Sequence, residues 1–298
     1  MSARIAILGV SGFIGKNIVD RFSAGGVEIL GCDIHSGKIG TLLVDSIDLT
    51  NEKSLSDWLG TRDIDAIIYL ASEIPQSFSN VNVSVFDNNV KMHKTVLNYW
   101  TQNRCQLIYA STCAIYGKSG PVPWREENAP APENYYSVSK IVGEWLFRTQ
   151  KPEENTLTVL RINAPYGVGG RKTVVNIFLE NALAGKPIGL FGSGRREQDF
   201  LHVSDIANAF WLAFSTGTSG TFNIASGTTV TMKQLAEKVI ETAKSTSEIE
   251  LTGTPDPGEE TKVRVDISKA GKQLGFTPIH SLESGLAECI KAYGAIKK

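Results

Sequence analysis

The side chains of this sequence best suited to acid–base chemistry are a tyrosine and a lysine four residues apart, Tyr136 and Lys140. Positions i and i+4 of a helix share one face, so phenol and ammonium point the same way. At about 4 Å and an effective dielectric of about 20, their attraction is roughly 4 kcal/mol. Because it favours the phenolate, it can lower a phenol pKa of about 10 by a few units. Tyr136 is therefore a candidate general acid/base, although the spacing also fits an incidental surface pair.

A glycine-rich turn follows the first expected strand, residues 5–8, and opens the first expected helix. Glycine permits a tight turn, close approach of the backbone to a phosphate and close helix–sheet packing. The free amides at the helix start favour an anion. This placement predicts a dinucleotide site. Its expected cofactor contacts are Gly9, Gly12, Phe13, Ile14 and Gly15.

Asp33 follows the second expected strand, about 20 residues beyond the glycine turn, where a carboxylate accepts hydrogen bonds from an adenosine ribose. The carboxylate would repel a 2′-phosphate, and Lys38 is the only cation close in sequence. We therefore expect NAD rather than NADP, the alternative being an ordinary aspartate at a strand end. Asp48, followed by Leu49, is expected either to meet the adenine or to cap a helix.

Short apolar runs alternate with helical patterns over the first half of the chain. Further strands are expected at 42–44, 66–70, 106–110 and 157–160, and helices near 55–59, over 83–100 and around Tyr136. This rhythm predicts an α/β fold with a doubly wound parallel sheet covered on both faces.

The rhythm loosens after Tyr166, which predicts a second, smaller α/β lobe. A helix to Phe214, a strand at 221–225, a helix opened by a capping box at 231–234 and a last helix from Leu282 are expected there, with a polar loop at 252–262. We expect residues 1–165 to form the cofactor domain, with 203–225 returning to it. Residues 166–202 and 226–298 would form the substrate-binding lobe.

The bulk composition excludes several classes. The 298 residues carry a net charge of −1, so nothing draws the chain toward nucleic acid, and no apolar run could span a bilayer. The first residues lead straight into a strand without a signal-peptide layout, so we expect a cytoplasmic protein with reduced thiols. The four cysteines and four histidines lack ligand spacing, so no metal site is expected.

Taken together, these motifs resemble the extended short-chain dehydrogenase/reductases, specifically the NAD-dependent epimerase/dehydratase family, over nearly the whole chain. The resemblance implies a Rossmann-like fold, NAD as cofactor and a nucleotide sugar as substrate. It adds Leu70, Ala71 and Ser72 beside the cofactor, and a structural role for Asn89. Further matching segments are 110–117, 161–167, 192–205 and 266–276.

The resemblance also implies a catalytic triad. Thr112 would hydrogen-bond the reacting oxygen of the substrate, and Tyr136 would exchange its proton. Lys140 would depress the tyrosine pKa and hold the nicotinamide ribose, while hydride passes between the sugar and the nicotinamide. Substrate contacts are expected at Thr112, Asn163, Arg196 and Gln198.

Three departures from the family pattern narrow the expected reaction. Cys113 and Ala114 replace the Asp-Glu pair of the 4,6-dehydratases, so dehydration is not expected. Gln198 stands where the family often has an arginine. Either Arg195 or Arg196 takes over the role of that arginine, or both are solvated loop residues. Ala164 stands where an asparagine is common, so the nucleotide-sugar site is expected to differ in detail.

The sequence thus favours a nucleotide-sugar epimerase, with a ketosugar reductase or dehydrogenase as the alternative and a non-catalytic dinucleotide sensor as a third reading. The resemblance also implies a homodimer formed through the helices over 83–100 and 136–150. Trp100 and Trp145 fit that interface or the core equally well.

Overall fold

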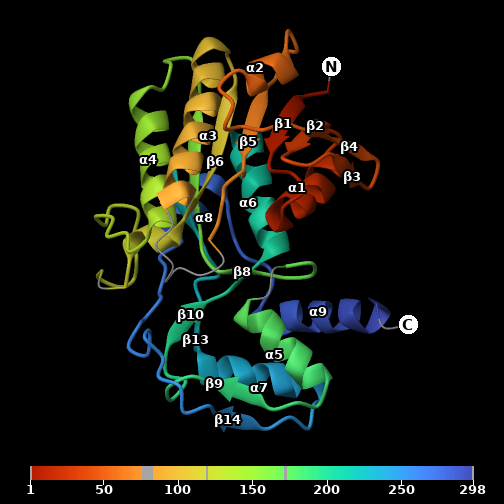
Figure 1. Cartoon of the computed structure of the whole chain (residues 1–298), viewed down its shortest axis with the longest axis vertical. Helices are drawn as coiled ribbons and strands as arrows, with labels where there is room; N and C mark the ends of the chain where they lie inside the picture. The colour runs from red at the N-terminus through yellow and green to blue at the C-terminus, as the bar shows by residue number, and fades with distance from the viewer. Residues whose placement is uncertain (1, 76–82, 119, 171–172, 297–298) are drawn as a thin grey trace.

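The computed structural model describes residues 2–75, 83–118, 120–170 and 173–296. An eight-stranded sheet forms its larger part, in the order β12-β7-β6-β5-β1-β2-β4-β3, with helices on both faces (Figure 1). Every neighbouring pair is parallel except β3 and β4. The predicted doubly wound parallel sheet is therefore confirmed. The strands are β1 (Arg4–Leu8), β2 (Glu28–Asp33), β3 (Gly37–Ile39), β4 (Leu42–Ser46), β5 (Ala66–Tyr69), β6 (Gln106–Thr112), β7 (Leu157–Ile162) and β12 (Gly220–Ile224).

Two apolar cores lie on the two faces of this sheet, which is why strands such as β5 are apolar at every position. One face is covered by α1 (Phe13–Ser23), α6 (Val203–Thr216) and α8 (Ser268–Leu274). The other is covered by α2 (Ser54–Leu59), α3 (Val83–Gln102) and α4 (Tyr135–Thr149). Trp100 lies in the second core and donates to the Cys105 carbonyl at 2.9 Å, whereas Trp145 is 58% exposed on α4.

A smaller region, at the bottom of Figure 1, has its own apolar core. Its helices are α5 (Val174–Leu183), α7 (Met232–Ala243) and α9 (Leu282–Ile296), and the predicted capping box at Thr231 and Gln234 opens α7. Three strand pairs complete it: β8 (Pro165–Tyr166) with β11 (Leu201–His202), β9 (Ile188–Leu190) with β14 (Ile249–Leu251), and β10 (Glu197–Asp199) with β13 (Thr229–Thr231).

The chain passes between the two regions several times. Segment 203–225 lies on the large sheet, because α6 packs on α1 and β12 pairs with β7. The expected assignment of all of 226–298 to the smaller lobe is wrong for α8. Its apolar side chains Ala270 and Leu274, with Phe276 just beyond, belong to the core of the large sheet. No helix of the described segments is long and apolar enough to cross a membrane.

Candidate active site

One cavity of about 1500 Å³ lies at the carboxyl ends of the parallel strands, where an open α/β sheet binds its ligands. Every residue predicted to bind cofactor or substrate lines it. They are Gly9, Gly12, Phe13, Ile14, Gly15, Asp33, Asp48, Leu49, Leu70, Ala71, Ser72, Thr112, Tyr136, Lys140, Asn163, Arg196 and Gln198. The structure thus brings them together, and their individual roles stay predictions.

The glycine turn is shaped for a phosphate group. A Cβ on Gly9 would lie 2.6 Å from the Ala71 nitrogen, and one on Gly15 would lie 2.4 Å from the Val10 oxygen. These two glycines therefore let the turn pack against the sheet. A Cβ on Gly12 would meet only the Gly9 oxygen, at 3.3 Å, so this side of the turn is open. Backbone amides beside open space at the start of α1 fit a pyrophosphate.

Asp33 is held at the edge of this turn by its own hydrogen bonds. Its Oδ2 accepts from the Ser11 amide at 2.9 Å and its Oδ1 from the Ile34 amide at 2.8 Å. Each carboxylate oxygen keeps a further lone pair for a ribose hydroxyl. Asp48 instead accepts from the amide and hydroxyl of Thr50 in a local turn. It does not cap α2, whose N-cap is Lys53.

The predicted catalytic side chains come from α4 and the end of β6. Asn134 caps α4 through a capping box with Ser137, which fixes the first turn of the helix. Tyr136 and Lys140 lie one turn apart on α4, and the Lys140 Nζ is 5.7 Å from the centre of the Tyr136 ring. Thr112 ends β6, and its Oγ1 accepts from the Ala114 amide at 3.1 Å.

Lys140 is buried deep beneath Tyr136 on the same helix. It is 2% exposed, and its Nζ donates to the Ala110 carbonyl at 2.9 Å. Burial lowers the pKa of Lys140 to about 7, and the Glu144 carboxylate opposes this shift. The protonation of Lys140 is therefore sensitive to pH near neutrality, a property that the sequence did not indicate.

A buried ionic network lies beneath the catalytic helix. Arg161 donates to both oxygens of Glu144, at 3.0 and 2.7 Å, and Ser111 donates to Glu144 at 2.5 Å. Arg161 also donates to the Tyr116 hydroxyl, which donates to Asn223. Sequence reasoning missed this network, although Glu144 lies four residues beyond Lys140 and so shares its helix face.

Asn89 has the structural role expected of it. Its amide accepts from the Glu73 amide at 2.8 Å and donates to the Glu73 carbonyl at 3.0 Å. It also donates to the Ser139 hydroxyl at 3.0 Å. A side chain on α3 therefore ties the loop after β5, on the cofactor side of the cavity, to the catalytic helix α4.

The opposite wall of the cavity is built by β10 and the loop over 252–262. Asn163 and Gln198 are partly committed to the protein: Asn163 donates to the Asp199 carbonyl at 2.6 Å, and Gln198 accepts from the Asp199 amide at 3.0 Å. Arg196 pairs with Asp256 at 3.4 Å and lines the cavity. Arg195 is 70% exposed and pairs with Glu259 outside the lining.

Sequence reasoning missed the contribution of the polar loop at 252–262 to this wall. Its members Asp256, Pro257, Gly258 and Thr261 line the cavity. Cys113 is a packing residue. It is fully buried, its thiol donates to the Arg161 carbonyl at 3.1 Å, and burial raises its pKa well above the ordinary value. A thiol of this kind is a poor nucleophile.

The doubly wound sheet, the glycine turn and the Tyr136–Lys140 pair at its carboxyl edge define a dinucleotide-binding protein of the short-chain dehydrogenase/reductase type. A family model narrows this class. The NAD dependent epimerase/dehydratase family matches residues 5–225, and the chain belongs to that family. NAD is the cofactor, and the glycine turn and Asp33 fit it.

Known relatives cover almost the whole chain but carry several activities. The crystal structure of a UDP-glucose 4-epimerase with UDP-glucose from Thermotoga maritima is 26% identical, with a TM-score of 0.88 over 99% of this chain and 100% of that one. The structure of a Thermus thermophilus UDP-glucose 4-epimerase with NAD is 25% identical, with a TM-score of 0.84 over 98% and 99%. An Escherichia coli dTDP-4-dehydro-6-deoxyglucose reductase is 28% identical over 97% of this chain and 96% of its own length.

Proposed function

We propose that this protein is an NAD-dependent nucleotide-sugar epimerase, which oxidises a sugar hydroxyl to a ketone and reduces it again from the other face. The observation that carries the proposal is the place of Thr112, Tyr136 and Lys140 in the cavity. All three line it between the glycine turn on one side and β10 on the other. A proton-transfer group there would be in reach of both a dinucleotide and a second ligand.

The protein groups that would hold NAD divide along the cavity. The amides after Gly9 would bind the pyrophosphate, and Asp33 the adenosine ribose. Asp48 and Leu49 would border the adenine, and Leu70, Ala71 and Ser72 would lie along the nicotinamide half. When bound, NAD accepts a hydride from the sugar carbon and later returns it.

The chain's own residues would move the proton. Tyr136, as the phenolate, takes the proton of the sugar hydroxyl, while Thr112 donates a hydrogen bond to the same oxygen. Lys140 in its charged form stabilises the phenolate, and its low pKa lets that charge respond to a bound cofactor. Return of the proton from Tyr136 to the reduced sugar closes the cycle with no net oxidation.

The substrate's nucleotide would lie along the opposite wall. Arg196 presents a guanidinium to the cavity, and such a group suits a diphosphate. Asn163 and Gln198 would add amide contacts. The preference for a particular sugar then depends on the loop over 252–262, because this loop supplies Asp256 as the partner of Arg196.

The cavity supports epimerisation over 4,6-dehydration. Elimination of water needs an acid beside the catalytic hydroxyl, and Cys113 and Ala114 offer none. Other carboxylates on the substrate side are already engaged. Glu133 lies 3.6 Å from the Lys118 ammonium, and Glu197 pairs with Arg264 at 2.9 Å.

Incubation with NAD⁺ and a panel of UDP and dTDP sugars tests the proposal. We expect NMR to show the C4 epimer of at least one sugar. Absorbance at 340 nm, which reports NADH, should show no net formation of reduced cofactor. NADH gained or lost in step with product would instead establish the reductase or dehydrogenase, which the 28% identity to the reductase favours. Binding of NAD⁺ without turnover of any sugar would instead favour the non-catalytic dinucleotide sensor.

We also propose a homodimer formed through α3 and α4. The exposed Trp145 on α4 gives this face a large apolar side chain, whereas the buried Trp100 supplies none. Light scattering after size exclusion should give twice the 32.3 kDa chain mass. Trp145→Glu should shift the population to monomer, and a monomeric wild-type protein would contradict the proposal.

A further inference from the structure

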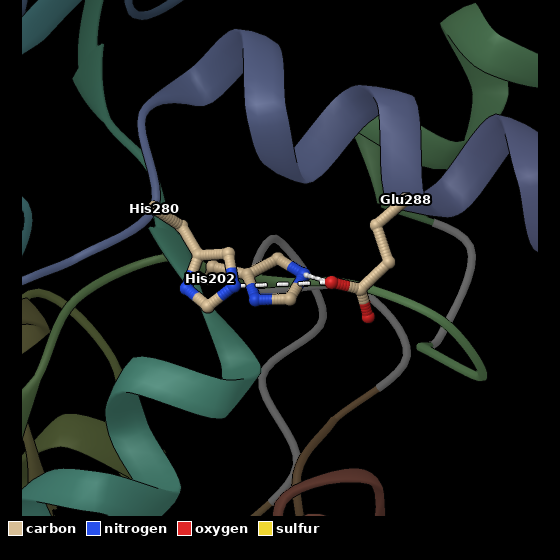
Figure 2. A group of neighbouring side chains, drawn as sticks. All are labelled: His202, His280 and Glu288. Carbon is tan, nitrogen blue, oxygen red and sulfur yellow. Dashed lines mark ion pairs between the residues drawn. The ribbon is translucent and has the colours of Figure 1, made fainter.

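Two histidines and a glutamate meet outside the cavity, where the end of β11 contacts α9 and the segment just before it. Figure 2 shows the rings of His202 and His280 beside each other, with the Glu288 carboxylate facing both. The ring centres are 4.2 Å apart. Glu288 Oε2 lies 3.9 Å from His202 Nε2 and 3.8 Å from His280 Nε2. One ligand atom from each residue lies within 4.8 Å of the others.

His202 is a buried imidazole that lacks hydrogen-bond partners. Its side chain has no exposed surface, and neither ring nitrogen has a hydrogen-bond partner within the described part of the chain. Burying a polar group in this way is unfavourable unless something binds it.

The fold brings the three residues together from separate elements. His202 ends β11 and is the N-cap of α6, His280 lies just before α9, and Glu288 lies on α9. Gly285 permits the contact, because a Cβ there would lie 2.9 Å from His202 Cδ2 and 2.2 Å from the Tyr166 hydroxyl. Glu288 is three residues further along and so shares the face that α9 presses on His202.

Asp205 fixes the backbone beside His280. Its two oxygens accept the Ile279 and His280 amides, each at 3.1 Å. The same carboxylate lies 3.1 Å from His280 Nδ1, which has no hydrogen-bond partner among the described residues. The other ring nitrogen, Nε2, lies 3.8 Å from the Glu288 carboxylate.

We propose that His202, His280 and Glu288 bind a divalent transition-metal ion of the zinc class. Two imidazoles and a carboxylate suit Zn²⁺ better than Mg²⁺ or Ca²⁺. Tetrahedral ligands about 2.1 Å from an ion lie about 3.4 Å apart. Each histidine nitrogen would move about 0.5 Å closer to Glu288, and the three donor atoms, which lie within 4.8 Å of one another, would close by up to about 1.4 Å. Water would take the fourth position.

This site departs from the expectation that the chain holds no metal. That expectation rested on spacing along the chain, whereas His202 and His280 meet only through the fold. None of the three ligands lines the catalytic cavity. The ion would therefore join α9 to the start of α6 rather than take part in the sugar chemistry, and the inference is independent of the proposed function.

Calorimetric titration of untagged, chelator-treated protein with ZnSO₄ tests the site. We expect one equivalent to bind and the melting temperature to rise with free Zn²⁺. Glu288→Gln should weaken binding by about tenfold or more, and His280→Ala should abolish it. His35→Ala is the matched control, because His35 is exposed and remote in sequence, and it should bind as the wild type does.

Cobalt distinguishes this site from the cysteines. Co²⁺ should give the visible bands of a tetrahedral ion without a thiolate charge-transfer band, because the ligands are nitrogen and oxygen. Glu288 is half exposed, so Glu288→Gln should fold normally, as checked by circular dichroism, even if His280→Ala does not. No Zn²⁺ binding by the wild type, or binding that Glu288→Gln leaves unchanged, would overturn the proposal.

Discussion

The two walls of the cavity hold their charged groups in opposite ways. Beneath the catalytic wall, Glu144 and Arg161 are only 4% and 6% exposed. Glu144 accepts a further hydrogen bond from Ser111, and Arg161 donates to the Tyr116 hydroxyl and the Glu126 carbonyl. On the substrate wall, Arg196 is 38% exposed and pairs with Asp256, and its neighbour Arg195, which lies outside the cavity lining, is 70% exposed and pairs with Glu259. A buried network has one arrangement, whereas exposed pairs can exchange partners. In the proposed mechanism, the rigid wall therefore supplies the proton transfer and the adaptable wall supplies the contacts to the substrate.

The largest effect is expected from Tyr136→Phe on the rigid wall. Loss of the proton-transfer group should lower kcat by about 10²- to 10⁴-fold. NAD⁺ affinity should change little, as measured by fluorescence titration, because the ring stays in place. Retained turnover of the sugar would show that another group transfers the proton.

Glu144→Gln should break the network under that wall. The change leaves the Arg161 charge buried without a counter-ion, so the free energy of unfolding should fall by about 3–5 kcal/mol in urea denaturation. The matched control is Glu154→Gln in the exposed pair with Arg104, which should cost less than about 1 kcal/mol. Equal effects of the two changes would remove the contrast between buried and exposed pairs.

Lys140→Met should reveal the low pKa of Lys140 as a pH dependence of stability. The folded protein releases this proton near pH 7 and the unfolded chain near 10.4, so between these values the unfolded state binds more protons. Wild-type stability should therefore rise relative to Lys140→Met from pH 7 to 10, by at most about 1.4 kcal/mol per unit. Parallel stability curves for the two proteins would mean that Lys140 keeps an ordinary pKa.

The smallest effect is expected from Arg196→Gln on the adaptable wall. It should raise KM for the nucleotide sugar about tenfold, the worth of one charge-assisted hydrogen bond, and leave kcat nearly unchanged. Arg195→Gln, which alters a neighbouring exposed arginine, is the control and should leave both constants unchanged. A large loss of kcat in Arg196→Gln would show that Arg196 takes part in the chemical step and not only in substrate binding.

Local sequence patterns predicted the large-sheet region of the molecule well. Its strands are buried on both faces and its helices are amphipathic, so the apolar rhythm of 5–8 or 66–70 is unambiguous. The glycine turn, Asp33 and the Tyr136 helix follow from rules that act within a few residues. The capping box at Thr231 and Gln234 was predicted correctly for the same reason, because it depends only on residues three positions apart.

The remaining features depend on contacts between distant segments. Strands β8, β10 and β11 have two or three residues each, too few to show a period. Placement of α8 on the large sheet follows from tertiary packing of Ala270 and Leu274, which a short helix pattern does not reveal. The low pKa of Lys140 could not be predicted from the sequence for a related reason, since its burial is a property of the folded protein.

The repeated passage of the chain between its two regions limits how such an enzyme can be rebuilt. Strand β12 joins the large sheet, and helix α8 packs on it, only after the chain has passed through the smaller region. Neither region is a continuous stretch that could be cut out and expressed alone. An exchange of substrate preference between relatives would therefore have to graft separate surface segments, such as β10 and the loop over 252–262, onto an otherwise unchanged chain.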